Sequence, residues 1–195
     1  MKKAYIFALS LLAVPALADN NKGFYAGLGV SLTNNHDDFA LFDVNASVSA
    51  KNIKSNEIFG GYKYNDYLGA EVRYGSGTDA AKGVLFSADH KTVTGGVDAE
   101  VGKYKSIYYR PEMVNDEAKL YGLLGYTQLD ATVTTKDSTG KALTSTVTSY
   151  SGVSYGVGIG FVFADRFNIN FEYKNICHDL YDKAKTATIN LDYRF

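Results

Sequence analysis

The sequence predicts an all-β fold: an eight-stranded antiparallel transmembrane up-and-down β-barrel with long extracellular loops. Three observations predict it. Side chains alternate in polarity with a period of two, charges are confined to one face of the alternating segments, and short connections alternate with long ones. The composition agrees, with 16 Tyr, 11 Phe and 19 Gly but only 2 Pro, because aromatic residues favour strands and glycine disfavours helices.

The N-terminal segment 1–18 is expected to be a signal peptide rather than part of the fold. A basic start and an apolar stretch over 4–14 lead to the small residues Ala16 and Ala18, which give the pattern of a signal-peptidase site. Cleavage after Ala18 leaves a barrel domain over 19–195. No later apolar run reaches the roughly 18 residues that a transmembrane helix needs.

Six segments of the mature chain alternate clearly between apolar and polar residues. They are predicted as strands at 23–32, 58–64, 68–74, 153–163, 167–174 and 187–195. Two further strands, at about 97–109 and 119–129, carry apolar residues on both phases, and Lys103 and Lys105 make the first of them hard to place. We assign them as strands because the others need partners, and their register stays open.

The connections differ in length on the two sides of the predicted barrel. Short turns lie at 65–66 and 164–166, and a longer connection on the same side holds Pro111. The opposite side carries the long connections 33–54, 76–96, 130–149 and 175–185. Short periplasmic turns and long external loops are typical of membrane barrels of this kind, and an even number of strands places both ends in the periplasm.

Charge separates the two faces of the six clear strands. Their apolar faces hold no charged residue, whereas the opposite faces carry four acids and four bases: Glu57, Glu71, Glu172 and Asp192, with Lys63, Arg73, Lys174 and Arg194. An aromatic face against lipid and a charged face inside fit a membrane barrel better than a soluble one. Because eight strands leave room only for side chains, the charges predict a barrel-interior charge network; a narrow gated channel is the alternative.

Three stretches carry a resemblance to a known family: the hairpin 60–71, the run 154–160 and the ending 191–195. With them the chain resembles the eight-stranded outer-membrane β-barrel superfamily that includes OmpX, Ail, opacity proteins and the transmembrane domain of OmpA. The resemblance implies an integral protein of the cell outer membrane. It also implies that Leu191, Tyr193 and Phe195 form the C-terminal assembly signal read by the barrel-insertion machinery.

Catalytic and metal-binding patterns are weak. His36, His90 and His178 all fall in predicted external loops, and none has the serine spacing of a lipid A deacylase. We therefore expect no enzymatic activity, no cofactor and no metal site. The single cysteine, Cys177, has no internal disulfide partner. A formal net charge of −1 leaves no basic footprint for nucleic acid.

The long connections suggest contact surfaces. The segment 131–148 is Thr-rich and alternating, with a plausible turn at 137–140, so we expect the flanking strands to continue outward as a hairpin whose edge could pair with a partner strand. Apolar residues in the first and second long loops suggest either a binding patch or packing between loops. These are Phe39, Leu41, Phe42, Val44, Val84, Leu85 and Phe86.

The function that follows is that of a monomeric surface protein, in which a closed barrel presents loops for adhesion, host interaction or envelope integrity. The expected partners are outer-membrane lipid and lipopolysaccharide, with a host surface or matrix ligand as a candidate. Two alternatives remain open: an outer-membrane enzyme that modifies lipid by acyl transfer or hydrolysis at the rim, and a narrow passive channel.

Overall fold

The computed structural model describes residues 22–35, 46–48, 53–65, 67–86, 92–163, 166–176 and 184–195. The expected signal peptide, the three histidines, Cys177 and the apolar residues of the first long loop lie outside these ranges. The described residues form eleven strands in one antiparallel sheet. None of them belongs to a helix long and apolar enough to cross a membrane.

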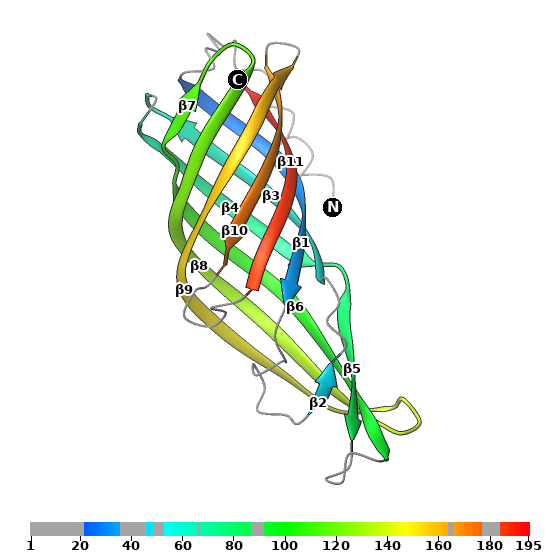
Figure 1. Cartoon of the computed structure of the whole chain (residues 1–195). Coiled ribbons are helices and arrows are strands. Elements are labelled where there is room, and N and C mark those ends of the chain that lie inside the picture. The colour runs from blue at the N-terminus through cyan, green and yellow to red at the C-terminus, as the bar shows by residue number, and fades with distance from the viewer. Residues whose placement is uncertain are drawn as a thin grey trace, which may run out of the picture.

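Eight of the described strands close into a ring, which confirms the predicted fold (Figure 1). The ring is closed where the seventeen-residue β6 pairs with β8. In their order around it, the strands are β1(Gly23–Asn35), β3(Ile53–Lys63), β4(Gly69–Gly77), β6(Val93–Tyr109), β8(Ala118–Asp137), β9(Ala142–Phe163), β10(Phe167–Asn175) and β11(Ala184–Arg194). Closure leaves the ring without a free edge, so every strand in it has two partners.

The two faces of the ring are inside out relative to a soluble protein. Leu28 on β1 is 60% exposed, while Ser31, on the other phase of the same strand, is fully buried. The same alternation runs along the other five clear strands, with apolar side chains outside and mainly polar side chains inside; Phe59 on β3 is a buried exception. The phase predicted from the sequence is therefore confirmed for these six strands.

A β-bulge explains why β6 could not be placed from the sequence. Val97 and Ala99 point inward in the outer half of the strand, whereas Tyr104 and Tyr108 point inward in the other half. The register with β8 shifts between Val101 and Tyr104, which moves the inward phase from odd to even positions. An extra residue in one strand of a pair produces such a shift, and no fixed period of two can describe the whole strand.

The barrel has a short-turn end and a long-loop end. The short-turn end carries the β3–β4 and β9–β10 connections, the C-terminus, and β7(Glu112–Val114), which pairs with β8 (Figure 1). Two asparagine side chains tighten its turns. Asn65 Oδ1 accepts hydrogen bonds from the backbone N–H groups of residues 67 and 68, and Asn115 Oδ1 accepts from those of residues 117 and 118.

At the long-loop end the sheet continues beyond the ring as an extension. It consists of β2(Ala46–Val48), β5(Ala80–Phe86) and the outer parts of β6, β8 and β9 (Figure 1). The long connection predicted at 76–96 contains a strand of its own, because β5 pairs along β6 where β4 stops. The hairpin expected around 131–148 is confirmed, since β8 and β9 stay paired up to a turn at 138–140.

Candidate functional site

The interior of the ring is organised around Arg73, which is buried on β4. Its guanidinium contacts three carboxylates that come from three strands. Glu172 on β10 is held by two parallel bonds, of 2.6 and 2.8 Å, and Glu57 on β3 by one of 2.7 Å. Glu71 accepts a hydrogen bond from the Arg73 Nε at 2.5 Å. The planar fork of arginine suits such multiple contacts, and bonds between charged groups are the stronger class of hydrogen bond.

Lys174 and three tyrosines complete this half of the interior. The Lys174 ammonium lies 3.1 Å from both Glu57 oxygens and 3.4 Å from Glu172. Each carboxylate also accepts a hydrogen bond from one tyrosine hydroxyl: Tyr104 bonds Glu57, Tyr121 bonds Glu172 and Tyr25 bonds Glu71, at 2.7–2.9 Å. Buried carboxylates are stable only when paired and hydrogen-bonded, and these three have both kinds of partner.

The second half of the interior lies toward the short-turn end and is centred on Glu112. Lys63 and Arg194 approach the same Glu112 oxygen, at 3.0 and 2.8 Å. Arg110 links the two halves, because one of its nitrogens contacts Glu71 at 2.6 Å and another lies 3.3 Å from Glu112. The Arg110 guanidinium also lies over the Tyr121 ring, 3.8 Å from its centre.

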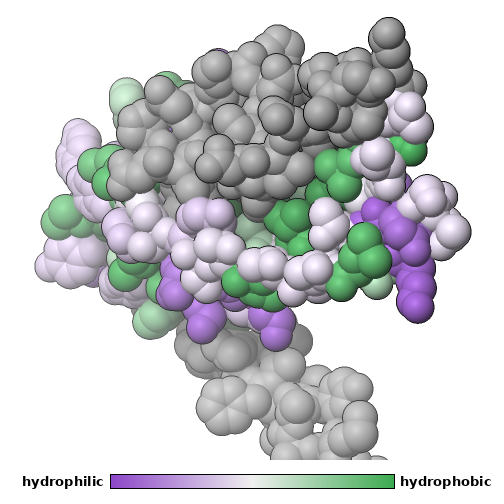
Figure 2. Space-filling view, turned by 90° about the horizontal axis from the view of Figure 1, so that it is seen from below, coloured by the Kyte–Doolittle hydropathy of each residue, from purple (hydrophilic) through white to green (hydrophobic). Residues whose placement is uncertain are grey.

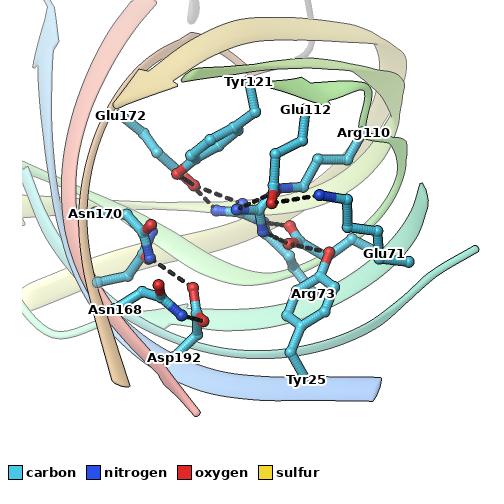
Figure 3. Close-up of polar contacts among 12 residues, drawn as sticks. Tyr25, Glu71, Arg73, Arg110, Glu112, Tyr121, Asn168, Asn170, Glu172 and Asp192 are labelled. Carbon is cyan, nitrogen blue, oxygen red and sulfur yellow. Dashed lines mark hydrogen bonds and ion pairs between the residues drawn. The ribbon is translucent and has the colours of Figure 1, made fainter. Parts of the chain in front are cut away.

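Asp192 on β11 anchors the remaining side of this second half (Figure 3). Lys119 forms an ion pair with it at 2.9 Å. The side-chain amides of Asn168 and Asn170 donate hydrogen bonds to its two oxygens at 2.6 and 2.7 Å. Arg194 links this side to Glu112, because its Nε lies 3.9 Å from Asp192 Oδ1. The described part of the chain thus buries six bases and five acids in one connected set of contacts.

The structure brings all eight charged residues named from the sequence into this set of contacts. Sequence reasoning missed Arg110, Glu112 and Lys119, because they lie in or beside the connection and strand whose register stayed open. It also missed the tyrosine hydroxyls. The inward position of Tyr25 was readable from the β1 alternation and was the one available signal.

Beyond the charges, toward the long-loop end, the interior becomes uncharged. Thr127 on β8 is bonded to Ser106 at 2.7 Å and to Ser154 at 2.8 Å, and Ser31 is bonded to Thr188 at 2.8 Å. Farther out, Tyr104 and Leu129 form a buried apolar cluster. Side chains therefore fill successive layers of the interior. Among the described residues no group of His, Cys, Asp and Glu is arranged to hold a metal ion.

Comparison with known families matches residues 4–195 to the outer membrane protein β-barrel domain. The chain belongs to this family. It is an integral protein of the outer membrane, with its short-turn end in the periplasm and its long-loop end outside the cell. Comparison with curated proteins finds no match.

Solved structures of outer-membrane barrels share this fold. Ail of Yersinia pestis, solved with the heparin analogue sucrose octasulfate, is 19% identical, with a TM-score of 0.52, and the match covers 90% of this chain and 99% of Ail. OprG of Pseudomonas aeruginosa is 13% identical, with a TM-score of 0.53 and coverage of 90% and 97%. The N-terminal barrel domain of P. aeruginosa OprF is 12% identical, with a TM-score of 0.50 and coverage of 89% and 99%.

The C-terminal residues of this outer-membrane barrel lie at its periplasmic rim. Leu191 faces outward, and the rings of Tyr193 and Phe195 meet edge to face with their centres 5.2 Å apart. The Phe195 N–H donates a hydrogen bond to the carbonyl of Phe24 at 3.0 Å. The periplasmic rim of a membrane barrel commonly carries such a girdle of aromatic rings.

The extension outside the cell is dominated by the β8–β9 hairpin, whose strands have 20 and 22 residues. Asp137 fixes its turn. The Asp137 carboxylate accepts hydrogen bonds from the Thr139 hydroxyl at 2.6 Å and from the Lys141 N–H at 2.9 Å. These bonds, the one from Thr139 foremost, lower the pKa of the Asp137 carboxyl. Seen from the long-loop end, hydrophobic and hydrophilic residues are interleaved (Figure 2).

Proposed function

We propose that this outer-membrane protein is a non-enzymatic surface protein whose rigid barrel displays the β8–β9 hairpin for adhesion or host contact. The observation that carries the proposal is the length of the hairpin. A strand needs about 9–11 residues to cross a bilayer, and β8 and β9 have 20 and 22. A large part of each strand therefore stands outside the membrane.

The outer part of β9 has the properties of a contact edge. Its pairing with β10 stops at Tyr155, so among the described strands residues 142–154 pair only with β8. At the usual rise per residue this open edge runs for about 40 Å. It contains no charged residue, and natural edge strands commonly use charges to prevent pairing with other chains. We infer that this edge accepts a strand of a partner protein by β-augmentation.

The filled interior supports a structural rather than a conducting role. The ion pairs and tyrosine hydroxyls around Arg73 connect strands from opposite sides of the ring. The buried apolar cluster of Tyr104 and Leu129 lies next to them inside the barrel, on the side of the long-loop end. Moving an ion through this interior would require breaking several buried ion pairs at once. We expect no measurable conductance in planar bilayers.

The test is to shorten the hairpin without touching the barrel. Thr132 and Val147 are Cα partners in the β8–β9 register. Residues 133–146 can therefore be replaced by Asn-Gly, which forms a tight turn between paired strands. Cells displaying the shortened protein are expected to lose adhesion to host cells and matrix-coated surfaces. Slower migration of boiled than unboiled protein in detergent gels would show that the barrel still forms.

A matched control keeps the length and the open edge. Leu143 and Val147 are exposed on β9, and changing both to Thr preserves β-propensity while removing apolar side chains. If backbone pairing is the mode of contact, this variant adheres as the unaltered protein does. Unchanged adhesion, serum survival and envelope permeability in the shortened variant would contradict the proposal.

A further inference from the structure

The outer surface of the barrel is hollowed where β3, β4, β6, β8 and β9 pass side by side. The hollow has a volume of about 850 Å³. Apolar side chains from neighbouring strands line one part of it, including Ile58, Val72 and Ile107, each of which is more than half exposed. These residues belong to the lipid-facing belt, so hydrocarbon chains are their natural contact.

The other part of the groove is polar and cationic. Lys105 lies on β6 beside the apolar residues, with Tyr74 of β4 and Gln128 of β8 as its partners across the sheet. The Tyr126 hydroxyl donates a hydrogen bond to Ser151 Oγ at 3.0 Å in the same groove. Tyrosine beside a lysine is typical of the boundary between hydrocarbon and headgroups, where rings and long cationic side chains reach the polar region.

The β6 bulge is what places this positive charge outside. The shift between Val101 and Tyr104 turns Lys103 and Lys105 to the outer face, where both are exposed. No ion pair or hydrogen bond joins either ammonium to another described residue. A lysine that faces lipid at the bilayer midplane costs about 2–4 kcal/mol, and the cost falls to about 0–1 near the interface. Both lysines therefore belong at the headgroup level of the outer leaflet.

We propose that this groove is a binding site for lipopolysaccharide, with acyl chains on Ile58, Val72 and Ile107. A phosphate of the lipid A headgroup lies on Lys105 in the groove and on Lys103 beside it, two positions away on the same face of β6. The two exposed ammonium groups and their position at the long-loop end favour this occupant over a lipid of the inner leaflet.

The outer face near the lysines also carries acids. Asp130 lies opposite the bulge, and its carboxylate accepts a hydrogen bond from Ser149 at 2.6 Å. Glu100 is exposed three positions before Lys103, on the extension side of the bulge, and Asp98 beyond it is paired with Lys136.

The groove lies on the barrel wall, so lipid binding there does not depend on the role of the hairpin. One lipid molecule is held at a defined place, in addition to the membrane lipid that surrounds the whole belt. A phosphate between two lysines gives charge-assisted hydrogen bonds, and partial removal from water strengthens them. The bound lipid then covers the outer surface of the barrel wall where the ring meets the extension.

The experiment titrates the refolded full-length barrel in detergent with bisphosphorylated lipid A and counts bound lipid by native mass spectrometry. The variant Lys103→Gln/Lys105→Gln is expected to bind at least tenfold more weakly, and Lys103→Arg/Lys105→Arg to bind as the unaltered protein does. The matched control Lys82→Gln/Lys141→Gln removes the same charge from exposed positions on the extension and is expected to bind normally. Heat-modifiable migration checks that each variant is folded.

Two further probes separate the possible sources of affinity. Dephosphorylated lipid A is expected to bind the unaltered protein no better than lipid A binds the Lys103→Gln/Lys105→Gln variant. Phosphatidylglycerol is expected to bind at least tenfold more weakly than lipid A. Equal binding of lipid A to the double variant, or equal binding of phosphatidylglycerol and lipid A to the unaltered protein, would overturn the proposal.

Discussion

Arg73 on β4 and Glu172 on β10 form a two-pronged ion pair across the barrel interior, with N–O distances of 2.6 and 2.8 Å, although 99 positions separate them in the chain. The strands that carry them are not neighbours in the ring. The pair therefore connects opposite parts of the wall, which the backbone hydrogen bonds between adjacent strands cannot do.

The first prediction follows from this pair. Arg73→Met removes the guanidinium and leaves Glu57, Glu71 and Glu172 with fewer opposite charges. Breaking a buried ion pair from one side costs about 3–5 kcal/mol, because the remaining charge stays buried without its partner. Urea unfolding of the barrel refolded into lipid vesicles should show a decrease of this size in the free energy of unfolding.

Two controls accompany that measurement. Lys82→Met changes an exposed lysine on β5 and is expected to alter stability by less than about 0.5 kcal/mol. The double variant Arg73→Met/Glu172→Gln should be less destabilised than the sum of its single variants, because the two residues share one interaction. Additive effects would show that Arg73 and Glu172 act separately.

The second prediction concerns a glycine under an aromatic ring. Gly158 on β9 faces the ring of Tyr121, and a methyl group at this position would overlap that ring. Gly158→Ala is expected to lower the free energy of unfolding by about 1–3 kcal/mol, the usual penalty of overpacking. Gly122→Ala on β8 is the matched control, since its nearest atom is 3.5 Å away, an ordinary contact. Equal stability of the two variants in urea unfolding would argue against this packing.

The third prediction concerns the pH response of the hairpin turn. The Thr139 and Lys141 hydrogen bonds are stronger to the ionised than to the neutral Asp137 carboxyl, so they lower its pKa. A lowered pKa means that the carboxylate's support for the turn is complete at neutral pH and is lost as pH falls through that pKa. The amide signals of Thr139 and Lys141 should titrate in NMR spectra with a midpoint below the usual aspartate range. Asp137→Asn should abolish this titration, and a midpoint in the usual range would contradict the prediction.

The fourth prediction tests the C-terminal assembly signal that we propose for Leu191, Tyr193 and Phe195. Deleting Phe195 should reduce the assembled fraction in the outer membrane several-fold in cells. Refolding of the same variant from urea into vesicles should change little, because that reaction lacks the insertion machinery. Phe167→Ala removes a neighbouring outward ring, 5.0 Å from Tyr193, and serves as the control. Equal assembly of both variants in cells would count against a signal at the terminus.

Local alternation was enough to predict the wall of the barrel. Along β1 the outward position of Leu28 and the inward position of Ser31 follow from the pleat alone, since successive side chains of a strand point to opposite faces. The same reasoning placed Glu57, Arg73 and Glu172 on the inner phase. It failed on β6, because the bulge near Gly102 changes the phase within one strand and carries no periodic signal.

The amino-acid sequence by itself determined the class of fold, the phase of six strands and the side of the wall that meets lipid, because a repeat of two residues encodes these properties locally. Tertiary structure alone decided which charges meet. Arg110 and Glu112 join the network through ring closure, and Lys105 reaches the outer face through the bulge. The contacts of Arg110 and Glu112 and the outward position of Lys105 both depend on the register between strands distant in the chain. No local pattern specifies that register.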